Sequence, residues 1–232
     1  GKIWLAGGLD DGGTDAGITA AKGKWDSQIA GDGYPDGYAT GWNAADAWST
    51  GILLYVNATF KSGGGDIFMA GAEGPSNTSW WGSFTIYYGV KIDAGSGRIN
   101  LMSKALSGTN TGTQGLSLNY VGDNNQGWAG SPTVITSNAT TADAINIYSD
   151  QSANASGDAR AIISYWYSAY SATRGYQGTQ ILATANGGGI TITGIGGMSS
   201  TSNGHGMWWE FADILAKTGK ITLNSASNPN ST

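Results

Sequence analysis

A short strand-like unit recurs along the chain, and it restricts the fold more than any other feature. Each copy is a glycine followed by apolar residues at alternate positions and a small closing residue. The clear copies are residues 1–7, 65–71, 97–103, 189–194 and 219–225, with a weaker copy at 157–164. Alternation places Ile3 and Leu5, for example, on one face of a strand. Short strands cannot bury such a face alone, but stacked copies can, because each presents the same residue types at the same height.

The spacing of the leading glycines indicates a period. Gly65 lies 64 residues after Gly1, Gly97 lies 32 further on, Gly189 lies 92 after that, and Gly219 lies 30 beyond it. Interpreted as two, one, three and one periods, these distances predict a repeat of about 30–32 residues and seven or eight turns. A second strand usually precedes the glycine. Such strands are predicted at residues 52–58, 90–94, 144–148, 181–185 and 213–216.

These patterns predict an all-β fold, a right-handed β-helix or β-solenoid with long glycine-rich loop insertions. We expect residues 1–232 to form a single segment of a repeat array, with insertions at 7–50, 108–131 and 199–206 and a polar tail at 224–232. Gly97 and Gly219 are expected to have conformations that a Cβ atom disfavours. Shared repeat positions predict ten inward-facing side chains: Ile3, Leu5, Ile67, Met69, Ile99, Leu101, Ile190, Ile192, Ile221 and Leu223.

Composition supports a folded β protein and excludes several functions. The chain has 39 Gly, 10 Trp and 11 Tyr, and its charged fraction is 12%, against about 25% in typical domains. Its aromatic content separates it from disordered chains. The net charge is −5 and the 11 basic residues are scattered, so nucleic-acid binding is not expected. The chain lacks cysteine, which removes disulfides and thiolate chemistry. The sequence has no run of 18 apolar residues, so no membrane span is predicted.

No catalytic residue is predicted. His205 is the single histidine, it stands in a loop-like Asn-Gly-His-Gly sequence, and the chain has no Gly-x-Ser-x-Gly elbow. Carbohydrate cleavage on a β-helix needs carboxylates brought together from adjacent turns. The position after the corner glycine holds Asp66, Arg98 or Lys220 in different copies. We therefore predict that this position is variable and solvent-facing. We therefore expect a protein that is not an enzyme.

Two aspartate-rich stretches are calcium candidates. Asp10, Asp11 and Asp15 form one, and Asp32 and Asp36 form the other. Calcium prefers six to eight oxygen ligands, which closely spaced aspartates can supply. Neither stretch fits an EF-hand loop or a calcium-binding nonapeptide repeat, and aspartate with glycine also forms ordinary turns. No other cofactor is indicated.

Adjacent aromatic residues are candidate contacts for glycans or for other subunits. The candidates are Trp80, Trp81, Tyr165, Trp166, Trp208 and Trp209. Neighbouring residues on a strand face opposite ways, so at most one of each pair can lie in the core. The other can present a flat ring to a sugar, pack beneath a loop, or contact a neighbouring chain.

The repeat units at residues 65–71, 89–103, 179–197 and 213–225 resemble the filamentous haemagglutinin-like adhesins of Gram-negative bacteria. These large exoproteins carry many degenerate Gly-x-Ile-x-Leu strands. The resemblance implies secretion, display at the bacterial cell surface, fibre formation and adhesion, and it brings no catalytic residues. The partners that it implies are other copies or further repeats of the same polypeptide, and surface glycans are a second candidate.

The first repeat unit, at residues 1–7, leads to a prediction about assembly. Residues 1–7 are already a complete repeat strand with Ile3 and Leu5 placed for a core. We expect this strand to stack on further β-structure, from a longer polypeptide or from another copy, because an uncovered edge promotes strand pairing. Two function classes stay open: a structural or adhesive fibre segment, and a carbohydrate-binding or polysaccharide-cleaving β-helix.

Overall fold

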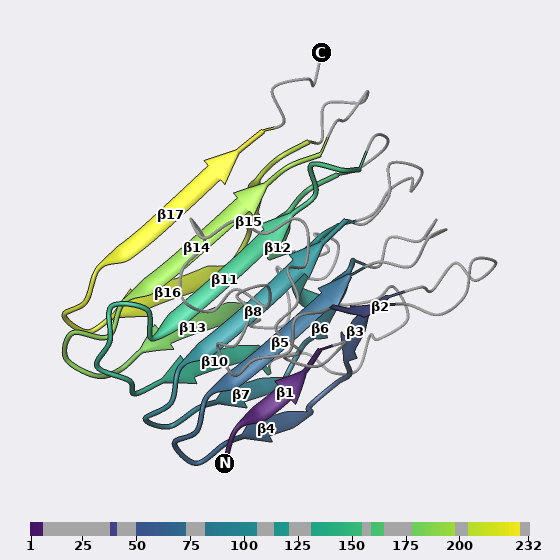
Figure 1. The fold of residues 1–232 in the computed structure, drawn as a ribbon. Helices are drawn as coiled ribbons and strands as arrows, with labels where there is room; N and C mark the ends of the chain where they lie inside the picture. Colours follow the sequence, from purple (N-terminus) through teal and green to yellow (C-terminus); the bar gives the residue numbers. More distant parts are fainter. Residues whose placement is uncertain are drawn as a thin grey trace, which may run out of the picture.

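The computed structural model describes residues 1–6, 38–40, 50–72, 82–105, 114–120, 131–154, 159–164, 178–197 and 204–227. Across these residues the regular structure is entirely β, in three sheets whose strand pairs are all parallel. The predicted all-β class is therefore confirmed. Figure 1 shows the strands stacked as rungs along one axis.

Two of the sheets have five strands each. Sheet 1 contains, in order, β3 (Ile52–Leu54), β6 (Phe84–Tyr87), β9 (Leu116–Tyr120), β12 (Ile162–Ser164) and β15 (Met207–Trp209). Sheet 2 contains β4 (Thr59–Lys61), β7 (Lys91–Asp93), β10 (Val134–Ser137), β13 (Thr179–Ala183) and β16 (Ala212–Ala216).

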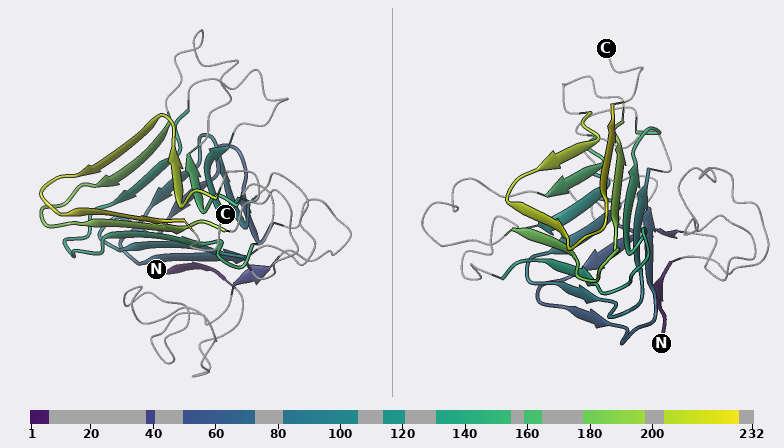
Figure 2. Two further views of the ribbon diagram at one scale, coloured as in Figure 1. Left: turned by 90° about the horizontal axis from the view of Figure 1, so that it is seen from above. Right: turned by 90° about the vertical axis from the view of Figure 1, so that its left-hand side faces the viewer.

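Sheet 3 has seven strands. Its five long strands are β5 (Ile67–Ala72), β8 (Ile99–Lys104), β11 (Ile145–Asp150), β14 (Ile190–Ile195) and β17 (Ile221–Ala226). Both β1 (Ile3–Leu5) and β2 (Ala39–Thr40) pair with β5. The chain visits sheets 1, 2 and 3 in that order and then begins again, so the strands form five turns of a three-sided β-solenoid (Figures 1 and 2). Successive turns wind right-handed in Figure 1.

The turns differ in length more than the sequence spacing suggested. Ile67 pairs with Ile99 after 32 residues, whereas Ile99 pairs with Ile145 after 46 and Ile145 pairs with Ile190 after 45. The interval between Gly97 and Gly189 therefore holds two turns, and the interpretation as three periods is wrong. The segment at 144–148 contains the missing sheet 3 strand, which begins at Ile145 and has Asp143 where the turn before it has Gly97. Similarly, Ile3 pairs directly with Ile67, so those 64 residues make one step.

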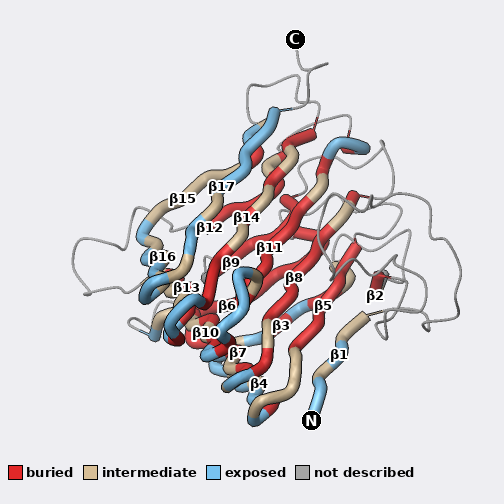
Figure 3. The backbone as a smooth tube through the Cα atoms, turned by 60° about the vertical axis from the view of Figure 1, so that its left-hand side comes forward, coloured by how far each residue is buried: buried red, intermediate tan, exposed pale blue. Residues whose placement is uncertain are grey.

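Alternate side chains of the strands form one continuous core inside the solenoid. Six of the ten predicted inward residues are fully buried: Ile67, Met69, Ile99, Leu101, Ile190 and Ile192. Ile3 and Leu5 are partly buried and pack against this core. Ile221 and Leu223 continue the same register but are 38% and 52% exposed. In Figure 3 the middle turns are largely buried and β17 is largely exposed.

Gly97 and Gly219 are needed for a reason that the sequence did not reveal. Positive φ falls on other glycines, such as Gly95 at 58°. A Cβ on Gly97 would lie 2.2 Å from the carbonyl oxygen of Gly65, and a Cβ on Gly219 would lie 2.0 Å from that of Gly188. At Gly97 and Gly219 a side chain therefore has no room, because the backbone of the preceding turn passes too close.

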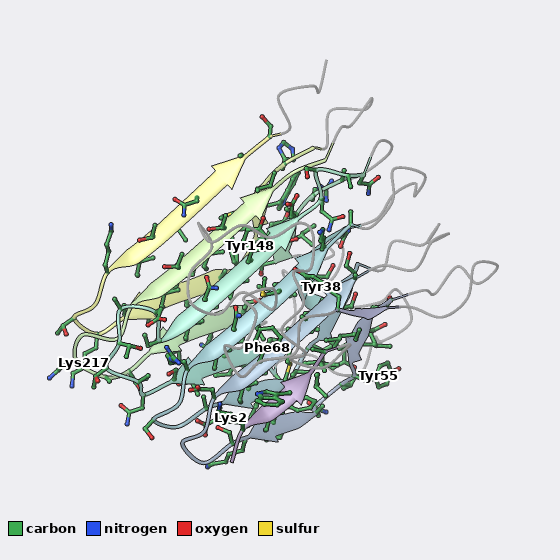
Figure 4. The ribbon with its side chains drawn as sticks, in the orientation of Figure 1. Lys2, Tyr38, Tyr55, Phe68, Tyr148 and Lys217 are labelled. Atoms are coloured by element: carbon green, nitrogen blue, oxygen red, sulfur yellow. The ribbon has the colours of Figure 1, made fainter. Side chains whose placement is uncertain are left out.

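The outer face of sheet 3 carries a second buried cluster, which consists of Tyr38, Phe68, Ala70, Ala72, Met102 and Tyr148. Figure 4 shows Tyr38, Phe68 and Tyr148 along this face. Polar side chains also stack in register here: the Asn146 amide donates to Asn100 Oδ1 at 3.0 Å. These contacts join neighbouring turns outside the core, in addition to the backbone ladders.

Candidate assembly surface

In the part of the chain that the structure describes, large exposed apolar side chains are confined to the two ends of the solenoid. Trp4, Leu53 and Tyr55 lie on β1 and the first turn, and Phe211, Leu215, Ile221 and Leu223 lie on the last turn. Within the described ranges, none belongs to turns two to four. Exposed apolar clusters of this kind are typical of interaction surfaces. The ends of the stack are therefore the candidate functional site.

The C-terminal end exposes the core itself. Ile221 is the register partner of Ile190 and Leu223 that of Ile192, and both partners are 0% exposed. Met207, Trp209 and Ile214 of the same turn are only partly buried against the core. The indole N–H of Trp209 is buried and has no hydrogen-bond acceptor among the described residues. We call this set, Met207, Trp209, Ile214, Ile221 and Leu223, the end face.

Backbone groups are exposed beside the end face. β15, β16 and β17 are the terminal strands of their sheets, and each is paired along one side only by the described strands. A strand edge of this kind presents a row of N–H and C=O groups that can pair with another strand. The end face thus combines apolar side chains with three parallel strand edges.

The N-terminal end has a different outline. β1 lies opposite Ile67–Met69 of β5, and β2 lies opposite Gly71 and Ala72. Together they make one nearly complete rung of sheet 3 beyond β5, whereas sheets 1 and 2 end at β3 and β4. Sheet 3 therefore projects by one strand at this end.

Trp4 and Lys2 mark the exposed outer side of β1. The Trp4 ring is 45% exposed, and Lys2 Nζ lies 5.5 Å from its centroid. Gly1 is equivalent to Gly65 and Gly97, but a Cβ placed on it would have no atom of the described residues within 4 Å. This open space contrasts with the tight corner between the internal turns.

Trp208 and Trp209 point in opposite directions, as the alternation predicted. Trp209 packs against the core. On the outer side, Trp208 Nε1 donates to Glu210 Oε1 at 2.8 Å, and the Arg160 guanidinium lies 4.3 Å from its ring centroid. His205 approaches the same ring edge-on at 5.4 Å. Trp208 thus belongs to a cluster of stacked and hydrogen-bonded side chains.

The remaining aromatic candidates, Trp80, Trp81, Tyr165 and Trp166, fall outside the described residues. The calcium candidates Asp10, Asp11, Asp15, Asp32 and Asp36 do so as well. In the part of the chain that the structure describes, no group of three or more His, Cys, Asp or Glu residues could hold a metal ion.

The position after the corner glycine is more organised than a variable solvent-facing position. Arg98 lies 3.5 Å from Asp66 and 3.4 Å from Asp143, and these carboxylates belong to the turns on either side. Asp66 also accepts the Arg98 backbone N–H at 2.8 Å. These side chains are partly exposed to solvent, and stacking of the turns also brings their opposite charges together, which the sequence did not reveal.

Sequence reasoning missed the exposed residues of the first turn. Leu53 and Tyr55 are 44% and 58% exposed, opposite in direction to the buried Ile52 and Leu54. The Tyr55 ring lies 4.8 Å from that of Tyr87. Burial of Tyr88, and to a smaller extent the nearby Tyr55, raises the pKa of the Tyr88 hydroxyl above its ordinary value. Residues 52–55 are all apolar or aromatic, so composition gave no signal, and only the two-residue period of a strand could have indicated that Leu53 and Tyr55 face away from the core.

Comparison with known proteins found no matching family model, no matching curated protein and no matching solved structure. In the described part of the chain, no helix is long and apolar enough to span a membrane.

Proposed function

We propose that this chain is a non-catalytic structural and adhesive segment of a secreted cell-surface fibre. In this role the stacked turns form a rod, and the ends of the rod join to further β-structure. The observation that carries the proposal is the exposure of Ile221 and Leu223, which hold positions that are completely buried one turn earlier.

Energetics favour covering this end. Complete burial of a leucine or isoleucine side chain is worth about 1.5–3 kcal/mol, and Ile221 and Leu223 are each only partly buried. An added strand could also pair with an exposed strand edge at this end, such as that of β17. Because the two ends are different surfaces, end-to-end contacts are head-to-tail, and such contacts extend into filaments when the copies stack along one straight axis.

Secretion and adhesion are supported by the repeat units that resemble filamentous haemagglutinin-like adhesins. The low charge and the absence of cysteine agree with this proposal. Carbohydrate binding is a second candidate function, and the exposed Tyr55 ring, backed by Tyr87, is the observation that favours it. Aromatic rings of this kind can stack on sugars. A glycan array would detect such binding, and Tyr55→Ala should abolish it if this ring is the platform.

Negative-stain electron microscopy and sedimentation velocity test the fibre proposal. The chain should form filaments one solenoid wide at high concentration. Leu223→Asp places a charge on the end face and should return the protein to discrete particles. Leu215→Asp is the matched control, since Leu215 is 60% exposed on the same turn but lies on the outer side of sheet 2. Discrete particles of the unmodified chain at every concentration would refute the proposal.

A further inference from the structure

We propose that sheet 3 runs from one copy of the chain into the next, with β17 of one copy paired in parallel to the β1–β2 rung of a second copy. This inference rests on the proposed function and specifies its partner as the same chain. It also defines a register, in which Ile3 lies beside Ile221 and Leu5 beside Leu223.

The sequences of the two edges support this register. Residues 1–5 read Gly-Lys-Ile-Trp-Leu and residues 219–223 read Gly-Lys-Ile-Thr-Leu, so four of five positions are identical. Ile3 already pairs with Ile67 in the same way that Ile221 pairs with Ile190. β1 is therefore a strand of the type that this ladder accepts on either side.

The lengths of the edges also match. In its own copy, β1 covers the first half of β5 and β2 covers the last two residues, Gly71 and Ala72. The equivalent residues at the end of β17 are Ser225 and Ala226. One rung built from β1 and β2 can thus span nearly the whole of β17.

The joint would continue an interface that the protein already uses. Between turns four and five, sheet 3 is held by a six-residue parallel ladder in which Ile190 and Ile192 are in register with Ile221 and Leu223. The proposed joint repeats this arrangement with Ile3 and Leu5, which are partly buried and pack against the core from the other end. The outer residues Thr222 and Trp4 would become neighbours.

The projection of sheet 3 at the N-terminal end limits how many strand pairs can form between two copies. Because sheet 3 projects by one strand there, sheets 1 and 2 of the two copies remain separated by about one additional strand spacing of roughly 4.8 Å. Trp209 and Ile214 lie next to this space. The joint has fewer strand pairs than an internal turn, so association should be reversible and concentration-dependent.

The register also places Lys2 beside Lys220. Both lysines precede the first paired isoleucine by one residue, so equal charges become neighbours at the joint. Salt weakens repulsion between exposed charges. Association should therefore strengthen as salt concentration rises, and Lys220→Glu should strengthen it at low salt.

Cysteine cross-linking tests the pairing directly, because the natural chain contains no cysteine. Trp4→Cys and Thr222→Cys are made in separate proteins, mixed and oxidised. Neighbouring strands lie about 4.7–4.9 Å apart, within the Cα separation of about 4.4–6.8 Å that a disulfide spans. The mixture should give a disulfide-linked dimer that neither protein gives alone, and the double variant should give a ladder of multimers.

Trp4→Cys mixed with Leu215→Cys is the control, and it should not cross-link above background. Lys2→Cys with Lys220→Cys provides a second pair if replacing Trp4 disturbs β1. Filaments without cross-links at either pair would overturn the β1–β17 joint and leave the fibre proposal standing. Discrete particles without cross-links would overturn both. Equal cross-linking with the control would also overturn the joint, since the contact would then be non-specific.

Discussion

Ile190 and Ile221 are register partners on adjacent strands, yet Ile190 is completely buried and Ile221 is 38% exposed. Their side chains face the same interior, and they differ in what lies beyond them. Ile190 has a turn on each side, whereas Ile221 belongs to the last described turn. The difference between these equivalent residues is the basis of the assembly proposal.

Substitutions of core residues should destabilise the protein more in a middle turn than in the last turn. Ile147 is completely buried on β11, so Ile147→Ala should lower the free energy of unfolding by about 2–5 kcal/mol. Leu223→Ala, measured at a concentration where the chain is monomeric, should cost less than about 1 kcal/mol because this side chain is half exposed. Urea denaturation measures both values. Equal losses would mean that β17 is covered in the monomer.

The close backbone approach at the corner between turns predicts that the effect of a Gly→Ala substitution on stability depends strongly on its position. Gly97→Ala should destabilise the protein by about 1–3 kcal/mol, because its Cβ would meet the carbonyl of Gly65 at 2.2 Å. Gly1→Ala is the matched control, and thermal unfolding should barely change, since nothing lies within 4 Å of that Cβ. A Gly97→Ala variant as stable as the unmodified chain would show that the turns are not this close.

The ion pairs of Arg98 should contribute only modestly to the free energy of unfolding. Arg98→Met removes ion pairs to Asp66 and Asp143. All three side chains are partly exposed, so the loss in unfolding free energy should be at most about 1 kcal/mol. This loss should shrink as salt rises, because salt screens such pairs. A loss of several kcal/mol that is independent of salt would contradict this description.

The raised pKa of Tyr88 predicts that the free energy of unfolding changes at alkaline pH. Its pKa in the folded protein is raised above the ordinary value of 10.0, chiefly by burial. Above that pH the unfolded chain releases the proton while the folded protein keeps it, so the unfolded state is favoured and stability falls as pH rises. Tyr88→Phe should reduce this fall. Parallel pH profiles for the two proteins would show that Tyr88 titrates alike in both states.

The fold class could be predicted from the sequence because the solenoid repeats a local pattern. Alternation after each glycine identified β1, β5, β8, β14 and β17 of sheet 3, and eight inward residues that pack in or against the core. The number of turns could not be predicted, because Asp143 takes the place of the corner glycine before β11 and the middle turns are 45 or 46 residues long. β2 has only two residues, and no local pattern marks it.

The candidate site could not be predicted from the sequence, because it depends on where each turn lies in the stack. Ile221 and Leu223 carry the same sequence signal as their buried equivalents, so their exposure follows from their place at the end of the stack. The wrong period also concealed the Arg98 interaction, since Asp143 becomes a neighbour only when the next turn is 46 residues away. The opposite directions of Trp208 and Trp209 were predictable, because alternation is local.

Amide hydrogen exchange at two protein concentrations tests the central claim most directly. If the two ends of the solenoid join, amides of β1 and β17 should exchange more slowly at high concentration, while amides of β8 and β11 should be unchanged because they are already paired on both sides. Leu223→Asp should remove this dependence, and Leu215→Asp should retain it. Exchange in β1 and β17 that does not change with concentration would contradict the claim.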